Sequence, residues 1–541
     1  MKRICKLALT LVLVLAMAAG FSGCGGGGGD FDASTMTIGS STSVDTLNPL
    51  SSYEQQSFEI IALVYDPLVR YDKELNPSPA LADDWKISKD EKTWTFHLNK
   101  NAKWHDGEPV TSEDVKYTYE LMLDTGLGYM YSSYLEGITD ITCPDERTVV
   151  IKTKLPKANM LMNTTPIMPK HIWEKVQKEE LETWDNGEMI GSGPYKLVSN
   201  ENGIVKVSKN EKYYGTKPAV ENYVFVEYKN TDSLAQALKV GEIDAAVNLS
   251  ATQYSQLEDE ENVTVISGEV QGFMQVGINC SEDPASKGNP LLKDAEIRKA
   301  IEYATDKQNI IDMAYQGHGT EGTTMLNASD PYHYAPKGEE LRSYNIEKAN
   351  KLLDDAGYKD KNGDGIREDA DGNKLSFEFI NIGDNSAEVK TGQLIASTCK
   401  EAGIEIDLKT MDSGALQDAI TAADYDMFMW GWGGDYDPTV MMGILTTAQI
   451  GSNNEPQWSN AKYDQLYEKQ QTEMDKEKRI ALVQEMEKIA YDEAPYIILL
   501  YDNNIQGYRS DRWTGVEQIP EKGTYYFNMT IENYINAAPV K

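Results

Sequence analysis

The chain has 541 residues, of which 40% are apolar and 25% are charged, so roughly two or three globular domains are expected and a disordered or low-complexity chain is excluded. Its formal net charge is -35, and so acidic a surface disfavours nucleic acid and anionic lipid head groups as partners. The five cysteines include no CxxC pair and the five histidines form no HExxH motif, which argues against a zinc site, a disulfide framework or a histidine-based triad.

The first 35 residues are predicted to be a leader and a tether rather than part of the fold. A basic MKRICK precedes the apolar run LALTLVLVLAMAAGF, which has the length of a secretory signal core and is short for a membrane span. The following Ser22-Gly23-Cys24 resembles a bacterial lipobox, with Phe21 where leucine is usual, and in that pattern Cys24 is acylated after cleavage. Residues 1–23 are then a lipoprotein signal peptide and residues 24–35 a glycine-rich tether. The alternative is an ordinary secretory signal with a chance cysteine.

The mature chain alternates between short strands and amphipathic helices. Alternating apolar and polar residues predict strands at 92–100, 147–154 and 204–210. A helix capped by Thr231 or Asp232 should end at Gly241, before a further strand. The periodicity also predicts one long helical stretch from Asp294 to Gly317, a helix pair over 459–495 that Pro495 ends, and a buried strand at 496–502. This order is that of an α/β or α+β protein with several sheets.

The stretch DKNGDGIREDAD, residues 360–371, follows the spacing of an EF-hand calcium loop. Its candidate ligands are Asp360, Asn362, Asp364, the backbone carbonyl of Ile366, and Asp371 at the position where the loop usually carries glutamate. Aspartate is shorter than glutamate and reaches calcium less well with both oxygens. A tight turn rich in Asn, Asp and Gly accounts for the same residues, so both interpretations stay open.

The stretch FMWGWGGDYDPT, residues 428–439, combines large rings, flexible backbone and carboxylates in a way that suits neither a plain core nor a plain loop. Its three glycines lack a Cβ and would let another backbone approach closely. If the segment is extended, Trp430 and Trp432 point to the same side. Asp437 precedes a proline and is predicted to be a turn or cap residue. The alternative is that both tryptophans are core residues and that Asp435 caps a helix.

Several blocks resemble one protein family in both order and spacing. They are SVDTLNPL (43–50), VYDPLVRYD (64–72) with the long block at 79–120, IGSGPYKL (190–197), IRKAIEYATDKQNII (297–311), YNIEKANKLLDDAGY (344–358) and DYDMFMWGWGGDYDPT (424–439). Over nearly its whole mature length the chain is similar to the extracytoplasmic solute-binding proteins of ABC importers, in the peptide-binding class called solute-binding protein family 5. The resemblance implies a periplasmic-binding-protein-like α/β fold, bilobal and of type II with an additional accessory lobe, that closes on its ligand by hinge motion.

The resemblance also implies how the chain is divided and what it does. Lobe I would comprise residues 36–66, 190–276 and 507–541, the accessory lobe residues 67–189, and lobe II residues 277–506. The implied function is capture of dipeptides or oligopeptides and their delivery to the permease subunits of a transporter. The receptor would be a lipid-anchored monomer on the outer face of the cell membrane. Such a protein is not an enzyme and requires no cofactor.

The resemblance assigns the ligand cleft to two segments. In the first, Asp435 matches the aspartate that anchors the ligand's α-ammonium, whose desolvation a buried carboxylate would offset. Trp432 matches the aromatic wall of the site. The same segment contributes Trp430, Gly431, Gly433, Gly434 and Tyr436. In the second segment, Ser43, Val44 and Asp45 would present their backbone to the ligand amides, as in strand addition.

Two further sets of residues stay open. Tyr131 or Tyr134, in the aromatic-rich loop GYMYSSYLEG, either reach the cleft or pack inside the protein. No basic residue stands out as the anchor for a ligand carboxylate. Arg342 and His318 are candidates, although each fits a surface or loop position as well.

The ligand class is also open on sequence alone. Asp435 favours an amine, whereas two tryptophans could equally stack on an oligosaccharide. Twenty methionines raise the idea of a nickel or other metal chelate, but they are more simply core residues. A secreted glycosidase with paired carboxylates is the remote alternative, and no motif places two carboxylates across a cleft.

Overall fold

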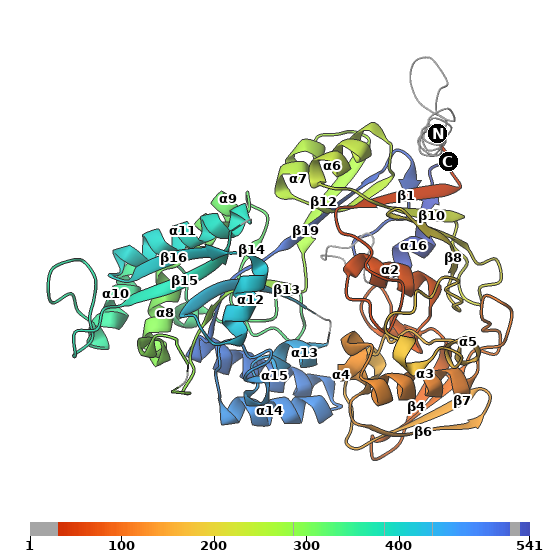
Figure 1. Ribbon diagram of the computed structural model, residues 1–541, viewed down its shortest axis with the longest axis horizontal. Helices are drawn as coiled ribbons and strands as arrows, with labels where there is room; N and C mark the ends of the chain where they lie inside the picture. The colour runs from red at the N-terminus through yellow and green to blue at the C-terminus, as the bar shows by residue number, and fades with distance from the viewer. Residues whose placement is uncertain (1–30, 285, 384, 435–436, 520–530) are drawn as a thin grey trace, which may run out of the picture.

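The computed structural model describes residues 31–284, 286–383, 385–434, 437–519 and 531–541. Three sheets carry most of the fold (Figure 1). The predicted signal peptide and lipidation site at Cys24 lie outside the described residues, as do Asp435 and Tyr436. Within the described residues, no helix combines the length and the apolar character needed to cross a membrane.

A seven-stranded sheet forms lobe I. Its strands, in sheet order, are β12 (Val263–Glu269), β19 (Asn503–Arg509), β11 (Ala245–Leu249), β1 (Thr35–Ser40), β10 (Asn222–Glu227), β9 (Ile204–Lys209) and β8 (Tyr195–Glu201). The first strand, β1, runs parallel to both neighbours, and the outer pairs are antiparallel. The helices of this lobe are α2 (Gln55–Val64), α6 (Thr231–Val240), α7 (Ala251–Leu257) and α16 (Glu532–Asn536). A short ladder pairs β20 (Trp513–Thr514) with β21 (Ala538–Pro539).

The cap of α6 differs from the prediction. Asn230, and neither Thr231 nor Asp232, occupies the N-cap position, because its side-chain oxygen accepts from the backbone N–H of Ser233 at 2.9 Å. The end of the helix is as predicted, since Gly241 adopts a left-handed conformation with φ +75.

The accessory lobe is built on a four-stranded antiparallel sheet. Its strands, in sheet order, are β4 (Ala82–Ile87), β5 (Thr93–Leu98), β7 (Thr148–Thr153) and β6 (Ile138–Asp145). The alternation that predicted strands at 92–100 and 147–154 is confirmed. Trp94 and Phe96 of β5 are buried with half-buried Thr95 between them, and Val149 and Ile151 of β7 are buried. The lobe also contains α3 (Ser112–Thr125), α4 (Ser132–Leu135), α5 (Lys170–Trp173), and the hairpin of β2 (Val69–Tyr71) with β3 (Pro77–Pro79).

A six-stranded mixed sheet forms lobe II. In sheet order its strands are β14 (Thr320–Glu321), β18 (Tyr496–Tyr501), β13 (Gly272–Ile278), β17 (Met427–Gly433), β15 (Ser376–Ile382) and β16 (Glu405–Met411). The helices are α8 (Ala295–Ala304), α9 (Lys307–Ala314), α10 (Ile346–Asp355), α11 (Ser386–Glu401), α12 (Ser413–Thr421), α13 (Pro438–Gly443), α14 (Ala461–Thr472) and α15 (Lys476–Glu493). The predicted helix pair over 459–495 and the buried strand after it are confirmed.

The single helical stretch predicted from Asp294 is wrong, because the chain breaks into α8 and α9. The side-chain hydroxyl of Thr305 donates to the carbonyl of Ile301 at 2.8 Å, and Asp306 then accepts from the backbone N–H of Asn309 at 3.0 Å. Asp306 is therefore the N-cap of a new helix. Neither signal interrupts the apolar periodicity, which is why the pattern alone missed the break.

The chain crosses between the sheets of lobe I and lobe II at two points. The crossovers lie between β12 and β13, at Val270–Gln271, and between β18 and β19, at Asp502. Both precede the predicted boundaries of 276/277 and 506/507. The first crossover is set by Gly272, whose φ of +141 only glycine adopts readily, and a Cβ there would lie 2.3 Å from the carbonyl oxygen of Trp432. The crossovers are neighbours, since Val270 N–H donates to the Asp502 carbonyl at 3.1 Å.

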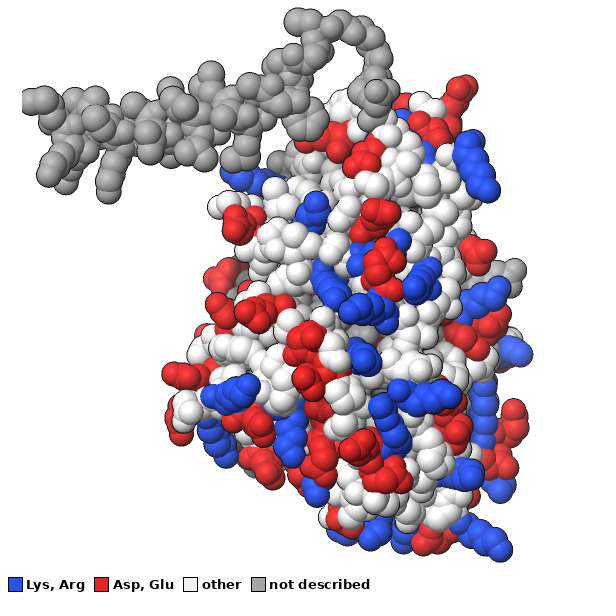
Figure 2. Space-filling view, turned by 90° about the vertical axis from the view of Figure 1, so that its right-hand side faces the viewer, with Lys and Arg blue, Asp and Glu red and all other residues white. Residues whose placement is uncertain are grey.

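The apolar core is divided unequally among the lobes. One cluster of buried side chains is continuous through lobe I and the accessory lobe, from Met36 and Tyr223 to Trp94 and Trp173. Lobe II has a separate large cluster. The odd number of cysteines left in the mature chain, Cys143, Cys280 and Cys399, predicts buried apolar thiols; Cys280 and Cys399 are buried in that second cluster, whereas Cys143 is only half-buried. On the surface, acidic and basic side chains are interspersed over the face that Figure 2 shows, an arrangement that favours solubility.

Candidate ligand-binding site

The central strand β17 is paired along the whole of one edge but along only part of the other. Along one edge it pairs with β13 over its full length, from Met427 to Gly433. Along the other edge β15 pairs with it only at Met427 and Phe428. Among the described residues, the rest of that edge has no ladder partner. Unpaired N–H and C=O groups on a strand edge are a template for another extended chain.

The two tryptophans of β17 lie on the same face of the sheet, as the extended conformation predicted. They are two residues apart in an unbroken strand, with Gln275 and Phe273 as their register partners on β13. Trp430 packs against a small cluster that includes Leu416 and Tyr425. Both indoles are half-buried, so each has packing on one side and an accessible side.

Glu455 holds the indole of Trp432 in place. One carboxylate oxygen, Oε2, accepts from Tyr496 Oη at 2.8 Å, from Trp432 Nε1 at 3.2 Å and from Gln275 Nε2 at 3.4 Å. Burial raises the pKa of this carboxyl to about 7, because desolvation outweighs the three donors. Sequence reasoning missed Glu455, since it lies in a loop without a recognisable motif.

The three glycines of the segment serve different purposes. A Cβ on Gly433 would meet no atom within 4 Å, so the space beside it is open. A Cβ on Gly431 would lie 2.5 Å from Met274 Sδ, and one on Gly434 2.6 Å from the carbonyl carbon of Gln271. The prediction that all three glycines admit a ligand backbone therefore fits the geometry of Gly433 only, because the other two make room for β13 and the residue before it.

Asp437 is confirmed as a cap residue. It is 1% exposed, and its Oδ1 accepts from the backbone N–H of Thr439 at 2.9 Å, at the N-terminus of α13. Its two oxygens also accept from Arg479 of α15, at 2.8 Å from Nη1 and 3.0 Å from Nη2. This bidentate buried ion pair fixes the end of the segment whose carboxylate at Asp435 is the predicted ligand anchor.

Of the three lobe I residues predicted to bind ligand amides through their backbone, two have backbone groups without a partner within the described residues. Ser43 is exposed and Val44 half-buried, and among the described residues the backbone groups of neither have a hydrogen-bond partner. Asp45 is engaged within the lobe instead. Its N–H donates to Ser57 Oγ at 3.2 Å, and its carboxylate accepts from the backbone N–H of Tyr53 at 2.9 Å and from Ser57 Oγ. Asp45 thus attaches the segment to the start of α2.

The accessory-lobe tyrosines pack inside the protein. Tyr131 is 9% exposed and lies edge-to-face with Phe58 at 6.3 Å between ring centroids. Tyr134 is 4% exposed. Of the two interpretations that the sequence left open, packing in the core is what the structure shows, and burial raises the pKa of Tyr131.

The two candidate carboxylate anchors also have structural roles. Arg342 forms a buried ion pair with Glu302, and its guanidinium carbon lies 3.5 Å from the ring centroid of Tyr491. The ring nitrogen His318 Nδ1 lies 2.8 Å from Ser267 Oγ of β12, and its ring packs on Tyr254 of α7 at 4.6 Å between centroids. His318 therefore joins lobe II to lobe I, and the side chains of both residues are engaged in contacts within the protein.

The predicted calcium loop does not gather its side chains around one point. Asp360 accepts from the backbone N–H groups of Gly363 at 2.7 Å and Gly365 at 2.9 Å, while Asp364 forms an ion pair with Lys374. Asn362 Oδ1 accepts from the backbone N–H of Asp364 at 2.8 Å. Among the described residues, no group of three or more His, Cys, Asp or Glu side chains is arranged to hold a metal ion. The loop is organised by Asx turns, and calcium binding through its oxygens, including the Ile366 carbonyl and Asp371, stays a prediction.

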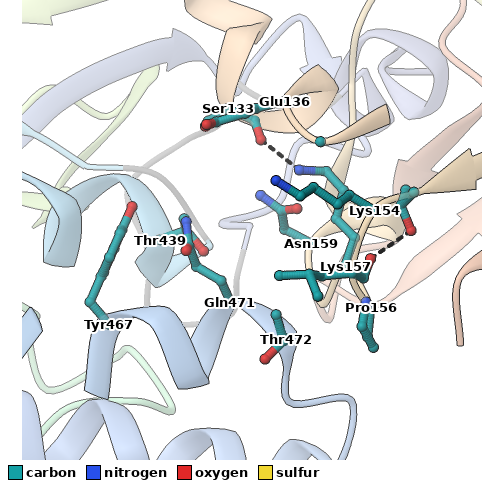
Figure 3. Close-up of a pocket in the computed structure, with 13 residues that line it drawn as sticks. Ser133, Glu136, Lys154, Pro156, Lys157, Asn159, Thr439, Tyr467, Gln471 and Thr472 are labelled. Carbon is teal, nitrogen blue, oxygen red and sulfur yellow. Dashed lines mark hydrogen bonds between the residues drawn. The ribbon is translucent and has the colours of Figure 1, made fainter. Parts of the chain in front are cut away.

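A pocket of about 230 Å³ lies where the accessory lobe meets lobe II (Figure 3). We call it the interlobe pocket; residues 133–159 of the accessory lobe form one wall and residues 439–472 of lobe II the other. The walls are joined by a hydrogen bond from Ala158 N–H to the Gln471 carbonyl at 3.1 Å. Sequence reasoning missed this pocket, because its two walls are far apart in the chain.

Comparison with known proteins agrees with this architecture. Residues 76–453 match the family model of bacterial extracellular solute-binding proteins, family 5, middle region. The oligopeptide-binding protein AppA of Bacillus subtilis is 27% identical over 481 residues, which are 87% of this chain and 86% of AppA. Protein XP55 of Streptomyces lividans is 29% identical over 495 residues, 90% of this chain and 86% of its own length.

Solved structures show the same fold. The substrate-binding protein CtaP of Listeria monocytogenes superposes with a TM-score of 0.79 at 24% identity, covering 94% of this chain and 100% of CtaP. NikZ of Campylobacter jejuni, solved with Ni(L-His), gives a TM-score of 0.76 at 23% identity over 94% of this chain and 100% of NikZ. The family match extends over more than half of the sequence, and the chain belongs to family 5 of the bacterial extracellular solute-binding proteins.

Proposed function

We propose that this protein is the lipid-anchored receptor of an ABC importer, which captures peptides between lobe I and lobe II and delivers them to a membrane permease. The observation that carries the proposal is the edge of β17 from Met429 to Gly433, which has no ladder partner within the described part of the chain, together with the backbone of Ser43 and Val44, which has no hydrogen-bond partner there. An extended peptide offers N–H and C=O groups at the spacing that such edges accept. The similarity to the oligopeptide-binding protein AppA supports the same ligand class.

Each residue of the cleft would have a distinct task. Asp435 pairs with the ligand's α-ammonium, and Trp432, held by Glu455, forms the wall beside it. Gly433 leaves the open space that lets a ligand backbone reach the edge of β17. None of these tasks involves bond making or breaking, so the proposed role is binding and not catalysis.

The ligand class is tested with the chain that begins after Cys24, so that the protein is soluble. Mass spectrometry of the ligand that co-purifies, followed by calorimetry, should identify peptides. If oligosaccharides or Ni(L-His) bind tightly and peptides give no heat, the peptide assignment is wrong. Turnover of any bound compound would contradict the proposed role as a receptor.

Asp435 is tested separately from the fold. Asp435→Asn should weaken binding of a free-amine peptide by about tenfold or more, since it removes a charge-assisted contact. The matched control is Asp475→Asn, the same chemical change at an exposed helix cap of lobe II. Equal affinities in the two variants would remove Asp435 from the site.

The lipid anchor is tested in the cell. Metabolic labelling with a radioactive fatty acid should label the full-length chain, and Cys24→Ser should abolish both the label and retention at the membrane. An unlabelled wild-type protein would leave an ordinary secretory signal as the explanation.

A further inference from the structure

Glu455 is a buried carboxyl group without a basic partner. It lies in the loop before α14 and is only 7% exposed. Three neighbouring strands of the lobe II sheet each direct one neutral donor at its Oε2, namely Gln275 from β13, Trp432 from β17 and Tyr496 from β18. Within the described part of the chain, no lysine, arginine or histidine forms an ion pair with it. A buried carboxylate without a cation is costly, so the neutral acid is favoured.

The amide of Gln275 points to a proton on Glu455 in a second way. Gln275 is 0% exposed, and its Nε2 donates to Glu455 Oε2 at 3.4 Å, so the amide lies against the carboxyl group. Its Oε1, however, is a buried acceptor with no hydrogen-bond partner among the described residues. Buried polar atoms nearly always have a partner. A carboxylate cannot supply the missing donor, whereas the O–H of a protonated carboxyl group can.

The other titratable groups around Glu455 are neutral. Tyr496 donates to its Oε2, and Tyr425, just before β17, donates to its backbone carbonyl. Burial raises the pKa of both phenols well above the ordinary value. Cys280, whose backbone N–H donates to the Pro456 carbonyl, has its pKa raised by burial to about 11. Burial raises the pKa of Glu455 to about 7, so among these groups Glu455 changes charge near neutral pH.

Trp432 connects this carboxyl group to the ligand cleft. Its Nε1 donates to Glu455 Oε2 at 3.2 Å, while the half-buried ring keeps an accessible side. In the proposed function, that side is the wall beside the ligand's α-ammonium. An indole attracts a cation to its electron-rich face, and an indole N–H that donates to an anion is polarised further. A positive charge at the ring therefore favours the ionised form of Glu455, both directly and through the indole.

We propose that Glu455 positions Trp432 and loses its proton when the ammonium group of a peptide binds beside the indole. The step is an acid dissociation, in which the carboxyl O–H bond breaks, its electron pair stays on the oxygen and the proton passes to the buffer. The proposal rests on the peptide-binding function proposed above and adds a proton to its binding equilibrium. Because the complex holds fewer protons than the free protein, affinity rises with pH through the pKa of Glu455.

The test counts protons by calorimetry. Polyalanine peptides of increasing length are screened, and the tightest binder is titrated at about pH 6.5 in phosphate and in Bis-Tris, two buffers with different ionisation enthalpies. The apparent binding enthalpy should differ between the buffers, because the buffer takes up the released proton. If binding lowers the pKa by one unit from about 7, about half a proton is released per peptide, and affinity rises about sixfold between about pH 5.5 and 7.5.

Two variants test the residues involved. Glu455→Gln keeps an acceptor for the indole N–H and resembles the neutral acid, so it should release no proton and bind with an affinity that does not change over this pH range. Trp432→Phe keeps an aromatic wall but lacks the N–H, so it should release clearly less than the wild type. It is the second test if Glu455→Gln fails to fold. The matched control is Glu59→Gln, which removes another buried carboxyl group with a raised pKa and should release protons as the wild type does.

Three outcomes would overturn the proposal while peptide binding stands. They are equal apparent enthalpies in the two buffers for the wild type, proton release that persists unchanged in Glu455→Gln, and proton release by Trp432→Phe that equals that of the wild type. Failure of every peptide to bind would instead refute the proposed function, and the proton coupling with it.

Discussion

Removing one partner of the buried ion pair between Asp437 and Arg479 should strongly destabilise lobe II, because the other charge is left buried and unpaired. Their side chains are 1% and 5% exposed, and two hydrogen bonds of 2.8 and 3.0 Å join them. Asp437→Asn keeps a good N-cap for α13, because asparagine caps as well as aspartate, but it leaves the guanidinium without a counter-charge. Removing one partner of such a pair costs about 3–5 kcal/mol. Asp437→Ala should cost about 1 kcal/mol more, because the cap is lost as well.

The measurement is urea unfolding of the soluble chain, with hydrogen exchange in α15 to follow lobe II separately, since a protein with several lobes need not unfold in one step. The matched control is Asp475→Asn at the N-cap of α15, where the side chain is exposed and also accepts from a backbone N–H. That change should shift stability by less than about 0.5 kcal/mol. If Asp437→Asn destabilises lobe II no more than Asp475→Asn does, the reasoning from burial is refuted.

Three further predictions concern pH, space and metal. Burial raises the pKa of the Glu59 carboxyl to about 8, so between about pH 5 and 8 the folded state keeps a proton that the unfolded state has released. The free energy of unfolding should therefore fall over this range by up to ~1.4 kcal/mol per pH unit. Urea unfolding of Glu59→Gln, which mimics the protonated carboxyl, should show no such fall. Parallel curves would contradict this. Gly433→Ala should lower peptide affinity without changing the melting temperature, whereas Gly434→Ala should lower the melting temperature, because its Cβ would lie 2.6 Å from the backbone carbonyl carbon of Gln271. Calcium or a chelator should leave the melting temperature unchanged, since the loop at 360–371 already uses its oxygens internally, and a shift of several degrees would show a site there.

The fold and the cleft segment could be predicted from the sequence, because both depend on local residue patterns or on the order of motifs along the chain. Neighbouring residues alone determine the alternation of β5, the end of α6 at Gly241 and the cap at Asp437. The interlobe pocket and the Glu455 contact to Trp432 depend on partners far apart in the chain, and no periodicity encodes such contacts. Arg342 illustrates a different limit: the sequence made it a candidate for binding a ligand carboxylate, because its buried partner Glu302 is 40 positions away in the chain and cannot be recognised as a partner from the sequence.

The continuous core of lobe I and the accessory lobe has a mechanical consequence. Two parts that share one close-packed interior cannot rotate independently, because interiors resist deformation. Lobe II has its own core and, within the described residues, is joined to the sheet of lobe I by two adjacent crossovers bonded at Val270 and Asp502, so we expect lobe II to turn as one body about them. Closure would then be described by one hinge angle, and any partner that contacts both bodies would respond to ligand binding through that angle.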